Sequence, residues 1–179
     1  YAVTSLRSGL ANVGLLAADA PGLARSEVND AMTKWSHQGF HFQHYWGLLS
    51  HGMIDLYSGE GDLTWRRVNE TWPALAGSLL LRIQAVRIEA TYLRARSALA
   101  ASKGSPDEKA LLAHALRDAK ALDREKLVQS SAFAALVRGG VCASSKDPAG
   151  ALASYTLAAE SFDRAQAALF AAAARRRAG

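Results

Sequence analysis

Four side chains that could do chemistry lie close together in one segment: His41, His44, His51 and Asp55. If the segment 40–57 is helical, all four project from about the same face, opposite an aromatic stripe. Neutral imidazoles and a carboxylate on one face are ligands that zinc and similar ions accept. His44 and His51, however, lie two turns apart, about 10 Å along the axis. Only His41 and His44 have ligand spacing, so the sequence predicts no metal site.

The same side chains are predicted instead to make polar contacts between helices or to line a ligand groove. If a metal did bind, the nearest further ligands in the sequence are His37, Glu60 and Asp62. A closed zinc site usually needs four ligands, and no set of four has suitable spacing on one helix. The metal-binding reading therefore stays an alternative built on His41 and His44.

Two stripes of charged side chains run along the next long helix, predicted at 74–102. They are Arg82, Glu89 and Arg96 on one stripe, and Arg87 with Arg94 on the other. Guanidinium groups could bind an acidic peptide or a phosphate, but a solvated helix face explains the same pattern. The candidate groove consists of His44, His51, Asp55, Arg87 and Arg94.

No catalytic residue and no cofactor are predicted. Nucleophilic catalysis needs a base beside the nucleophile, and Cys142 has no histidine in its helix or in the adjoining loop. Cys142 is therefore predicted to be a small core residue. A single cysteine provides no disulfide within the chain, which suits a reducing cytoplasm.

Composition narrows the class of protein. The chain has 179 residues, half of them apolar, and a net charge of +5. No apolar run approaches the roughly 18 residues that span a bilayer, so no membrane partner is expected. Acidic residues interrupt the basic ones, which argues against nucleic-acid binding. The sequence begins at Tyr1 within apolar periodicity and without a Met, so we expect a fragment of a larger protein.

Helices are predicted for nearly the whole chain, because proline is rare and good helix formers are abundant. They fall at about 2–18, 22–36, 40–57, 60–72, 74–102, 107–121, 124–143, 148–162 and 164–176. In the third, an aromatic and aliphatic stripe that includes Tyr45 and Tyr57 is expected to be buried. Pro73 is expected to begin the helix that follows it, and Gly139 with Gly140 to mark either close packing or a bend.

The loops between these helices recur. A serine-led turn sequence begins at Ser58, at Ser102 and at Ser145, which are 44 and 43 residues apart. An earlier turn around Pro21 separates the first two helices in the same manner. The pattern predicts an all-α, tetratricopeptide-like α-solenoid of about four helical hairpins plus a terminal helix, forming a single domain over 1–179. A closed helical bundle is the alternative.

Three stretches carry a family resemblance: HYWGLLSHGMIDLYSGEG, RVNETWPAL and LLLRIQAVRIEATYLRARSALA, all between His44 and Ala100. They resemble the tetratricopeptide-like region that follows the kinase domain in large bacterial serine/threonine protein kinases. This resemblance implies a cytoplasmic signalling protein whose ATP-binding and phosphotransfer residues lie upstream of Tyr1. The chain itself contains no glycine-rich nucleotide loop, no His-Arg-Asp and no Asp-Phe-Gly motif.

The sequence is expected to form a non-catalytic regulatory domain. Its partner is expected to be a protein or peptide segment or its own kinase domain. Two alternatives stay open. One is the helical sensor array of a signalling ATPase with a transcription-regulator tail, and the other is a metal-binding domain that uses the histidine-rich helix.

Overall fold

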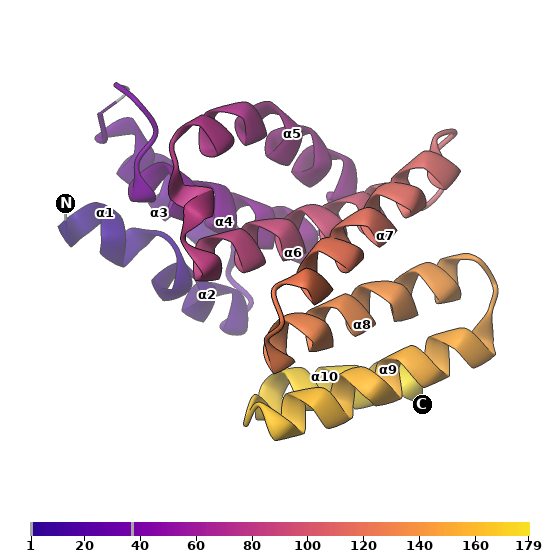
Figure 1. Cartoon of the computed structure of the whole chain (residues 1–179). Helices are drawn as coiled ribbons and strands as arrows, with labels where there is room; N and C mark the ends of the chain where they lie inside the picture. The colour runs from indigo at the N-terminus through magenta and orange to yellow at the C-terminus, as the bar shows by residue number, and fades with distance from the viewer. Residues whose placement is uncertain (1, 37) are drawn as a thin grey trace. The chain divides into compact units, whose positions relative to one another are not determined.

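All regular structure in the described part of the chain, residues 2–36 and 38–179, is helical in this computed structural model (Figure 1). No strand occurs among those residues. The predicted all-α class is confirmed. None of the described helices is long and apolar enough to cross a membrane.

The chain divides into two compact units, Tyr1–Arg87 and Ile88–Gly179, and the boundary falls within α6. The helices of unit 1 are α1 (Ala2–Arg7), α2 (Leu10–Ala17), α3 (Pro21–Thr33), α4 (Phe42–Tyr57), α5 (Gly61–Gly77) and a short 3-10 turn, η1 (Leu80–Arg82). Unit 2 contains most of α6 (Gln84–Ala101), then α7 (Glu108–Arg124), α8 (Val128–Ser144), α9 (Pro148–Arg164) and α10 (Ala168–Ala178). The single domain over 1–179 stays a prediction.

α4 is the central helix of unit 1, in contact with α1, α2, α3 and α5. Because neighbours surround it, nearly its whole circumference is covered, from Tyr45 through Leu48 and Leu49 to Ile54. The predicted stripe therefore covers only part of the buried surface of α4. The prediction was wrong for Tyr57, which is half exposed and donates a hydrogen bond from its hydroxyl to Asp19 on the turn between α2 and α3 (2.6 Å).

The first predicted helix, 2–18, is broken in two by a turn at Ser8 and Gly9. Gly9 has a φ of 63°, and its N–H donates to the Ser50 hydroxyl of α4 at 2.7 Å. A Cβ on Gly9 would lie 3.3 Å from the Trp46 ring. Asn12 then donates its side-chain amide to the Ala24 carbonyl of α3 (3.0 Å). The break is thus set by tertiary contacts with α3 and α4.

Pro73 does not begin a helix, contrary to expectation, but lies inside α5. It removes one donor from the helix, yet both Pro73 and Asn69, whose carbonyl loses that partner, are exposed to solvent. The helix ends instead at Gly77, with Ser78 as its C-cap, and Leu79 then adopts a left-handed φ of 65°. η1 follows, so α6 begins at Gln84, ten residues later than predicted.

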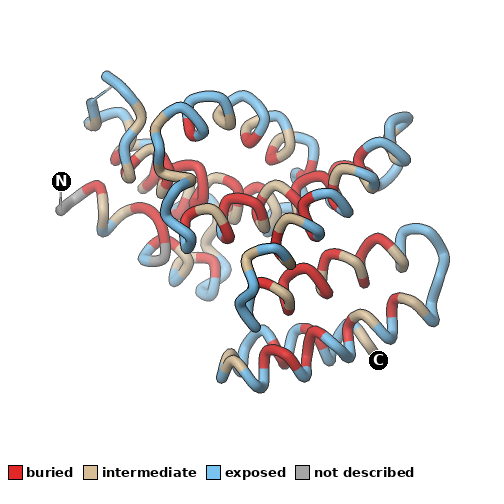
Figure 2. The backbone as a smooth tube through the Cα atoms, viewed as in Figure 1, coloured by how far each residue is buried: buried red, intermediate tan, exposed pale blue. Residues whose placement is uncertain are grey.

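α8 is the central helix of unit 2, and Figure 2 shows it buried along most of its length. It contacts α7 and α9, and its Phe133 ring stacks on Tyr92 of α6. A Cβ on Gly139 would lie 2.5 Å from the Tyr155 ring of α9, and one on Gly140 would lie 2.2 Å from Leu99 of α6. Of the two readings of these glycines, close packing is confirmed, since α8 continues through both of them.

One kind of turn joins several helix pairs. A residue with positive φ follows the helix, and the next N–H donates to the carbonyl five residues back. These donor and acceptor pairs are Ala20 to Leu15, Glu60 to Asp55, Asp147 to Cys142 and Ala167 to Phe162, all at 2.8–2.9 Å. The positive-φ residues are Asp19, Gly59, Lys146 and Gln166. The turns predicted after Tyr57, Ala101 and Ala143 are confirmed within one residue.

Candidate functional site

His41 and His44 lie together at the start of α4. The backbone N–H of His41 donates to Nδ1 of His44 (3.0 Å), which satisfies an amide at the helix end that has no partner within the helix. The two ring centroids are 5.5 Å apart, and the His44 ring stacks on Phe40. His44 therefore helps to cap the helix.

Asp55 was predicted either to make polar contacts between helices or to line a ligand groove, and it makes polar contacts between helices, with its side chain fully buried. Two arginines from neighbouring helices reach the carboxylate. Arg25 of α3 donates to one oxygen (2.5 Å), and Arg67 of α5 donates to the other through Nε (3.1 Å). Arg25 also donates to Glu60 (2.7 Å). This network, Asp55 with Arg25, Arg67 and Glu60, joins α3, α4 and α5 and is called the Asp55 network below.

His51 lies one turn before Asp55 in the same helix and is mostly buried. Burial lowers the pKa of His51 to about 4, and repulsion by Arg67 and Arg25 contributes to this, against attraction by Asp55. The ring is therefore neutral at physiological pH. Its Nδ1 is buried and has no hydrogen-bond partner among the described residues.

Arg87 and Arg94, the remaining groove candidates, both bind groups of their own unit. In unit 1, Arg87 donates to the carbonyl of Leu81 (2.7 Å) and so holds η1. In unit 2, Arg94 binds the Asp118 carboxylate of α7 through two donors, at 2.8 and 2.6 Å. The Asp118 side chain is almost wholly buried. The stripe of Arg87 and Arg94 is therefore not simply a solvated face, and the ligand groove itself stays a prediction.

His114, which was not among the predicted site residues, also lies beside Asp118. Nε2 of His114 lies 3.5 Å from the carboxylate, and Nδ1 of the same ring lies 3.0 Å from a nitrogen of Arg117. Burial lowers the pKa of His114, and the charges of Arg94 and Arg117 contribute to this, against attraction by Asp118. The spacing from His114 to Asp118 could have indicated a pair, but the partner Arg94 lies on another helix.

No three His, Cys, Asp or Glu side chains among the described residues converge to hold a metal ion. His37, a further ligand considered from the sequence, lies outside the described residues. Cys142 is half-buried beside the turn that starts α9, and burial together with the Asp147 carboxylate raises the pKa of its thiol. A raised pKa disfavours the thiolate that nucleophilic chemistry needs.

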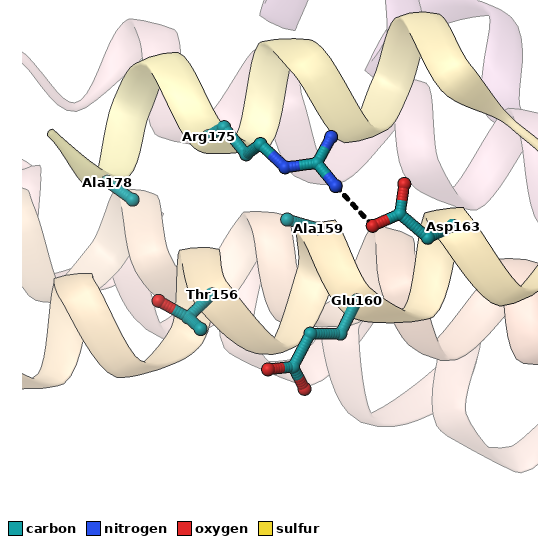
Figure 3. A pocket seen from close by; sticks show the side chains of 6 residues that line it. All are labelled: Thr156, Ala159, Glu160, Asp163, Arg175 and Ala178. Carbon is teal, nitrogen blue, oxygen red and sulfur yellow. Dashed lines mark hydrogen bonds and ion pairs between the residues drawn. The ribbon is translucent and has the colours of Figure 1, made fainter.

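A shallow pocket lies between α9 and α10 in unit 2 (Figure 3). Its lining residues are Thr156, Ala159, Glu160, Asp163, Arg175 and Ala178. Arg175 donates to the Asp163 carboxylate, whereas the Glu160 carboxylate points away from that ion pair. The polar groups do not converge on one point, so the pocket has none of the geometry of a catalytic site.

Comparison of the chain with protein-family models, with curated proteins and with solved structures finds no match.

Proposed function

We propose that this chain is a tetratricopeptide-like helical-repeat domain that binds a protein segment and performs no catalysis of its own. The observation that supports this most directly is the recurrence of hairpins with the same turn. α2–α3, α4–α5 and α8–α9 each close through a left-handed residue and a backbone bond five residues back. Stacked hairpins of this kind expose extended surfaces, and such surfaces usually bind partners.

The ionisable clusters support a structural role and not a chemical one. In the Asp55 network each carboxylate oxygen of Asp55 already accepts from an arginine, so the carboxylate is engaged within the protein. The Asp118 carboxylate is bound by Arg94 in the same manner. The metal-binding alternative gains no support, because Nδ1 of His44 already accepts from the backbone.

We further propose that the parent protein is a cytoplasmic bacterial serine/threonine kinase and that the domain regulates it or recruits its partners. This proposal rests on the sequence resemblance between His44 and Ala100. The alternative parent is a signalling ATPase with a helical sensor array. The coding sequence upstream of Tyr1 distinguishes them, since a kinase has His-Arg-Asp and Asp-Phe-Gly motifs and the ATPase has a phosphate-binding loop with Gly-Lys-Ser/Thr.

The protein-binding proposal is tested with purified chain in two assays. Selection from a library of displayed random peptides should enrich sequences that bind the chain and compete with one another. Incubation with magnesium, ATP and a generic acceptor protein should transfer no phosphate. Failure to enrich any peptide contradicts the binding function, and phosphate transfer that one point mutation abolishes contradicts the absence of catalysis.

A further inference from the structure

The exposed face of α7, in unit 2, is made of cations around an apolar centre. At 100° per residue its exposed side chains fall within an arc of about 120°. They are Lys109, Ala110, Ala113, Leu116, Arg117, Lys120 and Arg124. The stripe runs for about 22 Å, nearly the length of the helix, because Lys109 and Arg124 lie in its first and last turns.

The acidic side chains of α7 lie elsewhere or have partners inside unit 2. Asp118 is on the buried side with Arg94, and Asp123 binds Arg138 of α8. Glu108, in the first turn, lies outside the arc. Within residues 2–36 and 38–179, Lys109, Lys120 and Arg124 form no ion pair. Lys109, Lys120 and Arg124 are therefore available to a partner, whereas Arg117 lies beside His114.

The exposed faces of α9 and α5 carry both signs, whereas α10 carries only arginines as its charged residues, of which Arg175 binds Asp163. α9 presents Glu160, Asp163 and Arg164 on one side. α5 alternates Asp62, Arg66 and Glu70 at helical spacing. A face of mixed sign is typical of a solvated helix, whereas a stripe of one sign attracts an oppositely charged molecule and steers its approach.

We propose that the exposed face of α7 docks an acidic polypeptide segment in which carboxylates flank an apolar side chain. Charge complementarity requires an anionic partner. Leu116, 37% exposed at the middle of the stripe, adds an apolar contact that a polypeptide can match and a phosphate backbone cannot. A membrane surface would need several large apolar side chains on the same face, and this stripe has one. The inference rests on the proposed protein-binding function and specifies the chemistry of the partner.

The test measures binding of a short fluorescent peptide, in which glutamates flank a leucine at helical spacing, to the full chain. The disrupting variant is Lys109→Glu with Lys120→Glu. It should fold, since a glutamate in the first turn suits the helix dipole and the new carboxylate at position 120 would pair with Arg124 four residues on. The matched control, Lys103→Glu with Arg176→Glu, makes the same change in net charge at exposed sites outside α7.

We expect the α7 variant to bind about tenfold more weakly than wild type, and the control to bind within about twofold of it. A peptide with glutamine in place of glutamate should bind weakly to all three, and added salt should weaken the wild-type complex. Equal loss in variant and control, or no measurable binding by wild type, overturns the proposal. Tighter binding of an oligonucleotide or of anionic vesicles through Lys109 and Lys120 overturns it too.

The peptide-library selection distinguishes a failure of this inference from a failure of the broader protein-binding function. If the library yields binders that lack acidic residues and bind the α7 variant normally, the protein-binding function stands and the α7 surface is wrong. If the library yields no binder, the function itself fails. Should the double Glu variant unfold, Lys109→Gln with Lys120→Gln tests the same cations without reversing their charge.

Discussion

The two central helices, α4 in unit 1 and α8 in unit 2, are both buried on most of their circumference, but by different means. α4 buries polar side chains, Gln43, Ser50 and Asp55 among them, and satisfies the carboxylate with arginines from two other helices. α8 instead buries Ala132, Ala134, Ala135, Gly139 and Gly140. α4 is held by hydrogen bonds and ion pairs to its neighbours, and α8 is held by the close approach of neighbouring helices to its small residues.

This difference predicts different weaknesses. A buried charge that loses its partners is costly, so the packing around α4 should respond to changes of charge and of pH. A close-packed interface has no room for further atoms, so the packing around α8 should respond to added volume. Three sets of substitutions and one change of pH test this comparison.

The largest effect is expected from Asp55→Ala, which leaves Arg25 and Arg67 facing each other without the buried carboxylate. Removing one member of a buried ion-pair network costs about 3–5 kcal/mol of unfolding free energy. Urea denaturation measures it. The control is Asp30→Asn, which removes a solvent-screened carboxylate paired with Arg7 and Lys34 and should leave the urea midpoint nearly unchanged. Equal losses in the two variants would contradict a structural role of the Asp55 network.

Gly139→Ala should destabilise unit 2 by about 1–3 kcal/mol, because its Cβ would lie 2.5 Å from the Tyr155 ring. Gly14→Ala in α2 is the control, since a Cβ there meets nothing within 4 Å and alanine favours helix. That control should raise the thermal midpoint. If Gly139→Ala leaves the stability unchanged, Tyr155 can move and the α8–α9 contact is loose.

Acid should destabilise unit 1 through His51. The buried ring has a pKa of about 4, below its ordinary value of 6.5, so between these values the unfolded chain binds more protons. The free energy of unfolding is therefore highest above pH 6.5 and falls as the pH drops towards 4. The loss is about 2 kcal/mol at pH 4 once partial screening by solvent is included. Urea midpoints of wild type and of His51→Gln across this range measure it. The variant should lose less stability than wild type, and an identical loss would exclude His51 as the cause.

The smallest effect concerns two equivalent turns, one in each unit. Lys146 and Gly59 both adopt positive φ, at 60° and 78°. Lys146→Gly removes a Cβ from a left-handed residue and should stabilise the protein by about 0.5–1 kcal/mol, whereas Gly59→Ala should destabilise it by a similar amount. Thermal midpoints that shift in the same direction in both variants would show that the two turns are not equivalent.

Turns and helix type could be predicted from the sequence because their signals are local. The turns after Tyr57, Ala101 and Ala143 contain their own glycine, serine or proline residues, and the structure confirms them. The break at Gly9 could not be predicted in this way. It depends on Ser50, 41 residues away, which accepts the Gly9 N–H.

The candidate site residues likewise could be predicted only where their contacts are local in the sequence. The spacing of His41 and His44 correctly placed them side by side, because both lie in one turn of one helix. For Asp55 the sequence left open a contact between helices or a groove, because its partners, Arg25 and Arg67, lie on two other helices. Likewise, the Arg94 stripe looks available in the sequence, whereas in the folded chain Asp118 of α7 occupies its guanidinium.

The recurring left-handed turns have a consequence for how the chain folds. Each closes a ring of six residues, and the helices it joins pack against each other directly, so many contacts of a hairpin link residues that are near in sequence. Chains rich in short-range contacts lose little loop entropy before contacts form, and they fold quickly. Folding is then expected to start within a single hairpin, such as α8–α9, and to extend to its neighbours by addition, as in a one-dimensional array.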